Sequence, residues 1–459
     1  MIQPLLDYFR ISPDSFAGEF LPPDDLPEEI GFFQFGASNL CYGRCQSGVS
    51  TDIATSSKFE SHKSVRCDGN SLELPFNFDE VTENLRRERY RGKMTAEKQA
   101  FVTSGLIHKI YYLLRESFPI SIRRRLQKAY LRDWETLRFP AWPVDFTVDR
   151  LHEEILRLSM KAAGANRVPF VWFWPDGASS GLIMTHDVET SVGRNFTSQL
   201  MDLDDAYGFK ASFQVIPETR YDVSDEYVCE IRSRGFEFNI HDLNHDGRLY
   251  REREEFLRRA AKINSYARRY EARGFRAGSM YRNQDWYDAY EFSYDMSVPN
   301  VAHLEPMRGG CCTVMPYFVG KIVELPLTTV EDYSLFHILD DYSIDLWKQQ
   351  VALIGQRNGL VSFVAHPDYL VEQRPRKVYE ALLDFLRKTI ADNRIWTPLP
   401  REVDLWWRAR SQLKLTSRGT DWEIEGPEKE RASLAFAVLD GDQLIYELAD
   451  VPSRASAVR

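Results

Sequence analysis

Two short segments of the chain have the residue types and the spacing of a metal site. Asp187 and Glu189 form a D-x-E pair directly after the apolar run GLIM, and His241 and His245 form an H-x3-H pair directly after FEFNI. An extended backbone places residues two apart on one face, and one helical turn places residues four apart on one side. We therefore expect the carboxylates of the first pair to converge, and likewise the imidazoles of the second.

Two imidazoles and one carboxylate around an open position are a usual catalytic ligand set for zinc. Such an ion lowers the pKa of a water molecule towards neutrality and polarises a carbonyl oxygen, while a second carboxylate can take the proton of that water. The four residues therefore indicate hydrolysis of an amide or an ester. The structural alternative is that the histidines lie on a surface helix and that Asp187 caps the following loop.

The elements that would position these residues lie between residues 168 and 400, where short apolar runs alternate with helical stretches. Such β-α repeats predict an α/β fold with a parallel sheet or barrel, in which chemistry takes place at the carboxyl ends of the strands. The expected strands are PFVWFW, GLIMTHD, KASFQVI, GFEFNIH, GFRAGSM, FSYDMSV, KIVELPL and GLVSFVAH. The expected helices cover about 195–207, 224–234, 251–272, 343–357 and 376–391.

In this order the motifs resemble those of the polysaccharide deacetylase (carbohydrate esterase, NodB-like) superfamily, over residues 181 to 370. THDVE resembles the family's first motif in its D-x-D form, and the resemblance implies that Asp187 is the general base and Glu189 a metal ligand. HDLNH matches the family's H-x3-H metal motif, which implies that His241 and His245 complete the protein ligands.

Two further motifs extend the resemblance. GFRAG resembles the third motif, whose arginine pairs with the base and holds it ionised, and Arg276 is the matching residue. VSFVAHPD resembles the last motif, an apolar strand that ends in the histidine acting as general acid on the leaving amine, and His366 takes that place.

The sequence also departs from the family pattern. Glu189 stands where aspartate is usual, and its extra methylene moves the carboxylate outward by about 1.5 Å. Gly278 replaces the proline common in the third motif, which we expect to reshape the wall of the groove. Asp285 and Trp286 are the closest match to the less regular fourth motif.

The resemblance implies a distorted (β/α) barrel of the polysaccharide deacetylase type. It also implies a divalent metal, expected to be Zn²⁺, and hydrolysis of a non-peptide C–N bond. The expected substrate is an N-acetylated sugar or glycan precursor, used in surface polysaccharide biosynthesis. Two alternatives stay open: a catalytically degenerate sugar-binding or scaffold protein, and a hydrolase of a cyclic amide or ureide.

The other parts of the chain carry no such motifs. We divide the whole chain into regions by amino-acid composition. Residues 1–80 predict a β-rich segment, residues 81–167 a helical, basic connecting region, residues 168–400 the barrel, and residues 401–459 a small β-rich appendage. Within the appendage, the sequence DGD predicts a hairpin turn.

Residues 105–132 combine apolar residues at three- and four-residue steps with many arginines and lysines. This pattern is compatible with peripheral contact with an anionic membrane face. It also fits a helix packed on its own domain, the reading that we favour because Pro119 interrupts the element.

Composition limits the classes of function. The formal net charge of −10 argues against broad nucleic-acid binding. The N-terminus has no apolar leader and the chain has no long apolar run, so we expect a cytoplasmic protein. The 6 cysteines are expected to be reduced thiols, although Cys41, Cys45 and Cys67 allow an atypical metal knuckle. The sequence does not indicate an oligomeric state.

Overall fold

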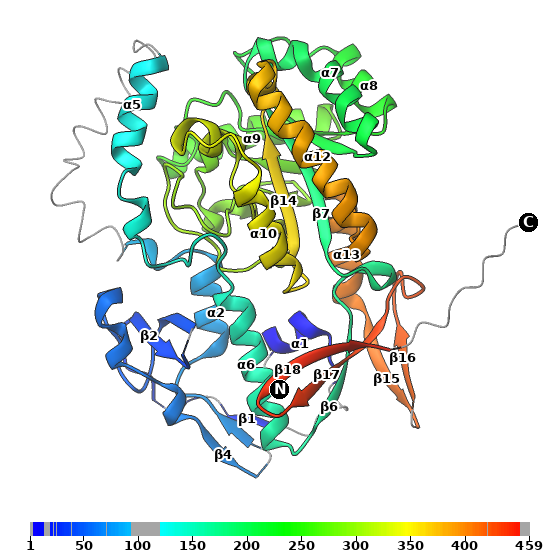
Figure 1. Cartoon of the computed structure of the whole chain (residues 1–459). Coiled ribbons are helices and arrows are strands. Elements are labelled where there is room, and N and C mark those ends of the chain that lie inside the picture. The colour runs from blue at the N-terminus through cyan, green and yellow to red at the C-terminus, as the bar shows by residue number, and fades with distance from the viewer. Residues whose placement is uncertain are drawn as a thin grey trace, which may run out of the picture. The chain divides into compact units, whose positions relative to one another are not determined.

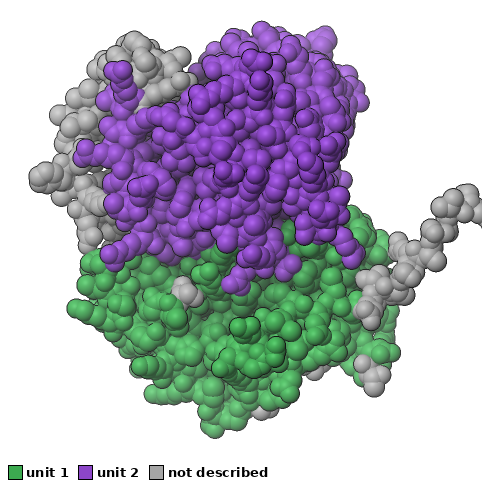
Figure 2. Space-filling view, in the orientation of Figure 1, with its two compact units in different colours: residues 1–85, 146–180, 405–459 green, residues 86–145, 181–404 purple. Residues whose placement is uncertain are grey.

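The computed structural model describes residues 3–12, 19–21, 23, 25–37, 39–69, 71–92, 120–419 and 421–449 (Figure 1). The chain divides into two compact units, which Figure 2 distinguishes by colour. Unit 1 comprises Met1–Leu85, Phe146–Ser180 and Leu405–Arg459, and unit 2 comprises Arg86–Asp145 and Gly181–Asp404. Each unit is therefore assembled from segments that are separated in the sequence.

Unit 2 is built on an eight-stranded sheet with the order β12-β13-β11-β10-β9-β8-β7-β14. All neighbours pair in parallel except β12 and β13, which are antiparallel. The strands are β7 (Gly181–Val188), β8 (Ala211–Val215), β9 (Glu237–His241), β10 (Gly274–Arg276), β11 (Tyr294–Asp295), β12 (Tyr317–Val319), β13 (Ile322–Glu324) and β14 (Leu360–Ala365). The order confirms the predicted distorted (β/α) barrel.

The central strands form because their sequences suit burial on both faces. Every residue of β7, β8, β9 and β14 is buried, as expected for parallel strands with near-continuous apolar runs. The polar exceptions at the strand ends include Asp187 and His241, which are also buried. These exceptions mark the edge of the sheet at which chemistry is expected.

The helices that follow the strands confirm the predicted alternation. They are α7 (Ser191–Tyr207), α8 (Asp225–Ser233), α9 (Arg253–Arg269), α10 (Asp345–Gly355), α11 (Pro367–Leu370) and α12 (Gln373–Asn393). In α7 the Thr190 side chain accepts a hydrogen bond from Val192 N, and Gly208 ends the helix with a φ of 83°. Both ends of this helix are therefore encoded by local capping residues.

Strand register brings the motif residues to one edge of the sheet. Arg276 on β10 pairs with His241 on β9, and Ala365 on β14 pairs with His186 on β7. Asp187, His241, Arg276 and His366 therefore all lie at or just beyond the carboxyl ends of neighbouring strands.

Unit 1 contains the remaining sheets. β6 (Arg167–Val171), β17 (Leu434–Asp440) and β18 (Gln443–Leu448) form an antiparallel sheet. The strand expected at PFVWFW thus lies in this sheet and not in the barrel. Gly441 has a φ of 60° between β17 and β18, which confirms the predicted hairpin turn at DGD.

Three smaller sheets complete unit 1. They are the pair β2 (Gly31–Phe35) and β3 (Asn39–Gly43), the sheet of β1 (Glu19–Leu21), β5 (Ser71–Glu73) and β4 (Arg66–Asp68), and the pair β15 (Lys414–Arg418) and β16 (Asp421–Glu425). Helix α6 (Thr147–Ala162) contacts β3, β5, β18 and α1 (Gln3–Phe9), so it links elements from distant parts of the sequence.

The connecting region contains α2 (Phe78–Arg86) and α5 (Ile120–Leu131). Residues 105–119 of the proposed membrane-contact segment lie outside the described residues. Within α5, Lys128 forms an ion pair with Asp340, and Gln127 Oε1 accepts a hydrogen bond of 2.5 Å from the Tyr333 hydroxyl. Among the described residues no helix is long and apolar enough to cross a membrane. Membrane contact therefore stays a prediction.

Candidate metal centre

Glu189, His241 and His245 come together at the carboxyl edge of the unit 2 sheet. Glu189 lies just after β7, His241 is the last residue of β9, and His245 lies in the loop that follows β9. Their potential ligand atoms all lie within 4.8 Å of one another. Nε2 of His245 is 2.9 Å from Oε1 of Glu189. This compact group of two imidazoles and one carboxylate fits a divalent metal ion.

His241 is prepared to act as a ligand through Nε2. Its Nδ1 lies 3.1 Å from the carbonyl oxygen of Arg276, which can only accept a hydrogen bond, so Nδ1 carries the proton. Nε2 is buried and has no hydrogen-bond partner among the described residues. Burial lowers the pKa of His241 to about 4, so the ring is neutral near pH 7. A neutral imidazole with a free lone pair is the form that binds metal.

Gly278 makes room for the second imidazole. Asp242 and His245 both have positive φ, 57° and 55°, so the H-x3-H segment is a sharply bent loop and not a helical turn. A β-carbon at position 278 would lie 2.8 Å from Cδ2 of His245 and 2.7 Å from a carboxylate oxygen of Asp242. The glycine is therefore a steric requirement of the loop that carries His245.

Asp187 and Arg276 form a buried ion pair next to the ligands. The guanidinium Nη1 donates to Asp187 Oδ1 over 2.8 Å, and the same nitrogen donates to Thr185 Oγ1. Oδ2 of Asp187 is 3.8 Å from Nε2 of His241. Burial opposes ionisation of Asp187, but the charges of Arg276 and the neighbouring histidines outweigh it and lower the pKa of Asp187. The carboxylate is therefore held ionised beside the ligand cluster.

His366 is paired with Asp332 and lies close to Glu189. Nδ1 of His366 lies 2.6 Å from Asp332 Oδ1, and the backbone N–H of His366 donates to Oδ2 over 2.7 Å. Nε2 of His366 is 3.8 Å from Glu189 Oε1. Burial opposes protonation, but Asp332 and the other carboxylates raise the pKa of His366 well above its ordinary value. The ring can therefore carry a proton at neutral pH.

Asp368 connects the segment of His366 to that of Glu189. Its carboxylate accepts hydrogen bonds from the backbone N–H of Glu189 at 3.0 Å and of Gly193 at 3.3 Å, and from the Thr190 hydroxyl. A β-carbon at position 193 would lie 2.2 Å from Asp368 Oδ2, so only glycine allows this approach. Asp368 thus fixes the backbone that carries Glu189.

Sequence reasoning placed all six motif residues at one site but missed Asp332 and Asp368. Asp332 follows no motif that we recognised. Asp368 is part of HPD, where its distance of two residues from His366 was the available signal. Asp285, taken as a match to the fourth motif, lies elsewhere: its side chain is 52% exposed and forms ion pairs with Arg87 and Arg89. His366 has its carboxylate partner in Asp332 instead.

His186, which lies between the site residues in the sequence, belongs to the core. Its Nδ1 lies 3.0 Å from the carbonyl oxygen of Ala365, and its Nε2 lies 2.9 Å from Asp204 Oδ2. The ring is fully buried. These contacts tie β7 to β14 and to α7, so His186 has a structural role.

The segment GASSG, residues 177–181, matches the G-x-S-x-G spacing of a nucleophile elbow. Such an elbow places the serine between a strand and the helix that follows it. Here a helical turn at Pro175–Gly177 precedes the serines and β7 follows them. The segment therefore lacks the context of an elbow.

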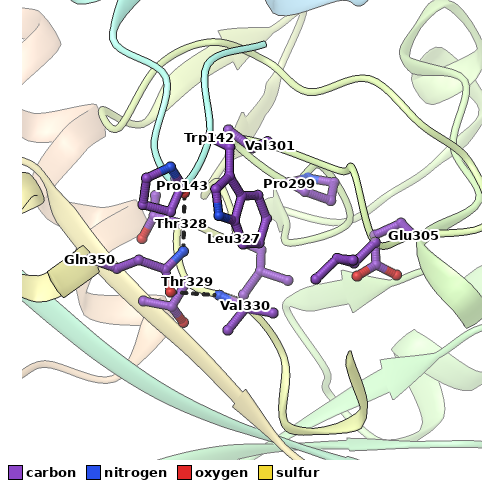
Figure 3. Close-up of a pocket in the computed structure, with 11 residues that line it drawn as sticks. Trp142, Pro143, Pro299, Val301, Glu305, Leu327, Thr328, Thr329, Val330 and Gln350 are labelled. Atoms are coloured by element: carbon purple, nitrogen blue, oxygen red, sulfur yellow. Dashed lines mark hydrogen bonds between the residues drawn. The ribbon is translucent and has the colours of Figure 1, made fainter. Parts of the chain in front are cut away.

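A small cavity in unit 2 is lined in part by residues 327–330, which precede Asp332 in the sequence (Figure 3). Trp142, Leu327 and Glu305 are among the residues that line it, and none of the six motif residues does. Gln350 closes one side, since its Nε2 donates to Pro143 O and its Oε1 accepts from Val330 N. The cavity has room for about one water molecule, too little for a substrate.

The fold and these side chains define a barrel with a candidate metal centre, flanked by one carboxylate–arginine pair and one histidine–carboxylate pair. No protein-family model matches the sequence, and neither does any curated protein. Solved structures similar to the chain include polysaccharide deacetylases.

A candidate polysaccharide deacetylase from Mycobacterium smegmatis is 17% identical, with a TM-score of 0.42, over 55% of this chain and 98% of its own. The PuuE allantoinase is 11% identical, with a TM-score of 0.42, over 51% of this chain and 92% of its own. The peptidoglycan deacetylase PdaC from Bacillus subtilis is 13% identical, with a TM-score of 0.32, over 50% of this chain and 92% of its own.

Proposed function

We propose that unit 2 is a metal-dependent hydrolase of non-peptide C–N bonds that removes the acetyl group from an N-acetylated sugar or glycan precursor. The observation that carries this proposal is the convergence of Glu189, His241 and His245 within 4.8 Å. Oδ2 of Asp187 lies 3.8 Å from Nε2 of His241, and Nε2 of His366 lies 3.8 Å from Oε1 of Glu189. The motifs of the sequence supply the substrate class, because they resemble those of the polysaccharide deacetylases.

Glu189, His241 and His245 would hold the ion, which we expect to be Zn²⁺. When bound, the ion supplies a Lewis acid that polarises the amide carbonyl and lowers the pKa of a water molecule. Three protein ligands are the number usual for a catalytic zinc site.

The flanking residues divide the proton transfers between them. Asp187, held ionised by Arg276, takes a proton from the attacking water as general base. His366, held protonated by Asp332, gives a proton to the nitrogen of the leaving amine as general acid. The two pairs thus keep a base and an acid ready at the same pH, which is the requirement for splitting an amide.

The first test is metal content, measured by inductively coupled plasma mass spectrometry on the wild type, His241→Ala and His245→Ala. Circular dichroism establishes folding, and His62→Ala, a substitution in unit 1, is the matched control. We expect about one divalent ion per chain in the wild type and in the control, and loss of the ion in both site variants. Failure of the wild type to take up any divalent ion after reconstitution would reject the proposal.

The second test is turnover. N-Acetylated sugars and glycans are incubated with the loaded protein, and release of acetate and of a primary amine is measured. Asp187→Asn should abolish turnover while it retains the ion, because Asp187 is proposed to move a proton and not to bind metal. Equal turnover of this variant and the wild type would show that another residue is the base.

A further inference from the structure

Tyr369 lies next to the proposed general acid. It follows His366 by three residues and belongs to the single-turn helix α11. The centroids of the two rings are 5.0 Å apart, with an interplanar angle of 43°. The side chain is half-buried. Tyr369 is therefore a component of the site on the side of His366.

The ring of Tyr369 is held by two other aromatic side chains. His337 meets it edge-on at 4.9 Å, and Tyr333 lies at 5.8 Å. Both belong to the segment that begins with Asp332, the partner of His366. The position of the Tyr369 ring is thus fixed by the same segment that orients His366.

The hydroxyl of Tyr369 differs from that of its neighbour Tyr333. In the described part of the chain it meets no hydrogen-bond partner, and it is not among the fully enclosed polar atoms. The neighbouring Tyr333 provides a contrast, since its hydroxyl is bonded to Gln127. Burial, together with the charges of Glu189 and Asp332, raises the pKa of Tyr369 well above its ordinary value. The group therefore stays a neutral donor and acceptor.

We propose that Tyr369 binds the amine half of the substrate, through a hydrogen bond between its hydroxyl and a hydroxyl group on a carbon adjacent to the carbon that bears the amide nitrogen. The inference rests on the proposed function, because His366 must face the nitrogen that it protonates. Groups attached to that nitrogen then lie on the side of Tyr369. Amino sugars carry a hydroxyl at this position, whereas simple alkyl amides do not.

Two physical arguments favour this role over packing alone. A phenylalanine would provide the same ring contacts, so the hydroxyl contributes nothing to the aromatic cluster itself. A site whose polar group hydrogen-bonds a substrate hydroxyl also discriminates strongly against an analogue that lacks it, because its own polar group is then left unpaired. Tyr369 would thus select hydroxylated amines.

The test compares Tyr369→Phe with the wild type on two substrates, an N-acetylglucosamine tetramer and N-cyclohexylacetamide. The second has a six-membered ring but no hydroxyls. We expect Tyr369→Phe to lower kcat/KM for the sugar about tenfold and to leave the value for N-cyclohexylacetamide unchanged. Tyr446→Phe, which removes a hydroxyl that already donates to Glu153 in unit 1, should leave both values unchanged.

Two kinetic results would overturn the inference. One is unchanged hydrolysis of the sugar by Tyr369→Phe, and the other is an equal loss on both substrates, which would indicate a structural role.

Binding is measured separately, by calorimetry of the sugar with Asp187→Asn and with Asp187→Asn/Tyr369→Phe. We expect about tenfold weaker binding to the double variant; equal binding, or none to Asp187→Asn, would also reject the inference. Absence of turnover by the wild type would instead count against the proposed function, and the calorimetry would still decide on Tyr369.

Discussion

Gly278 lies so close to the imidazole of His245 that a β-carbon on it would be 2.8 Å from Cδ2 of the ring. We predict that Gly278→Ala displaces His245 and weakens metal affinity at least tenfold, as loss of supporting residues does at other metal sites. Gly278→Pro, which introduces the residue common in the family motif, should be at least as harmful. The measurement is competition for zinc with a chromophoric chelator.

The control for this substitution is Gly355→Ala. Gly355 lies at the end of α10, and a β-carbon there would have no heavy atom within 4 Å. The affinity of the Gly355→Ala variant for zinc should equal that of the wild type. If Gly278→Pro retained full affinity for zinc, as the control should, His245 would not be the ligand that the geometry indicates.

Asp332→Asn tests the pairing of Asp332 with His366. The carboxylate raises the pKa of His366, so the proposed acid stays protonated to higher pH in the wild type. Without that charge the pKa of His366 falls, and the alkaline limb of the kcat profile should move to lower pH, with a loss of about tenfold or more at neutral pH. The measurement is kcat against pH, with Asp285→Asn, a change at an exposed ion pair, as control. An unmoved alkaline limb in Asp332→Asn would exclude His366 as the acid.

Asp368→Asn tests the support of Glu189. The substitution replaces one carboxylate oxygen by an amide nitrogen, so the backbone N–H groups of Glu189 and Gly193 can no longer both be satisfied as they are now. We expect metal affinity to fall about tenfold, with little change in the melting temperature of the metal-free protein. Asp384→Asn, at an exposed ion pair in α12, is the control. Unchanged affinity in Asp368→Asn would mean that Glu189 is positioned without this carboxylate.

His303 should make unit 2 sensitive to acid independently of metal. The ring stacks on Trp142 at 5.8 Å, and neither ring nitrogen meets a hydrogen-bond partner with good geometry in the described residues. Burial, aided by the charge of Arg308, lowers the pKa of His303 from 6.5 to about 4. The folded state therefore binds fewer protons than the unfolded state between these values.

The sign of the effect follows from this difference. The stability that neutral His303 contributes is complete above pH 6.5 and is lost as pH falls towards 4, by about 3 kcal/mol in total. His303→Phe, which keeps the stack on Trp142, should lose less stability over the same interval. Denaturant unfolding of the metal-free proteins at pH 7 and pH 4.5 gives the comparison. Parallel losses in both proteins would mean that His303 does not titrate as stated.

The sequence predicted the barrel well because its signals are local. Apolar runs such as GLIM and FEFNI, separated by amphipathic stretches, define β7, β9 and the helices between them. The six motif residues could be located because each lies at the carboxyl end of a strand or in the loop that follows it, and parallel strands bring their carboxyl ends to one edge.

Other features depend on contacts between distant residues and had no local signal. Asp332 reaches His366 across 34 residues and Asp368 reaches Glu189 across 179, with no periodicity to connect them. The run PFVWFW is apolar enough for a barrel strand, yet it pairs with β17 near the other end of the chain. The conformation predicted for the H-x3-H segment was also wrong. Asp242 and His245 have positive φ, so the segment is a bent loop and not the expected helical turn.

The pairing of β6 with β17 has a consequence for how the protein is made. About 260 residues separate the partners Val171 and Leu434, so a ribosome adding roughly 5–20 residues per second needs about 13 to 50 seconds to synthesise the second after the first. Throughout that time β6 has an unpaired edge on which β17 will later dock. The barrel strands emerge in order during the same interval and can find their neighbours. A newly made chain should therefore complete unit 2 before unit 1, with the apolar segment at Val168–Phe173 exposed to chaperones until β17 has been synthesised.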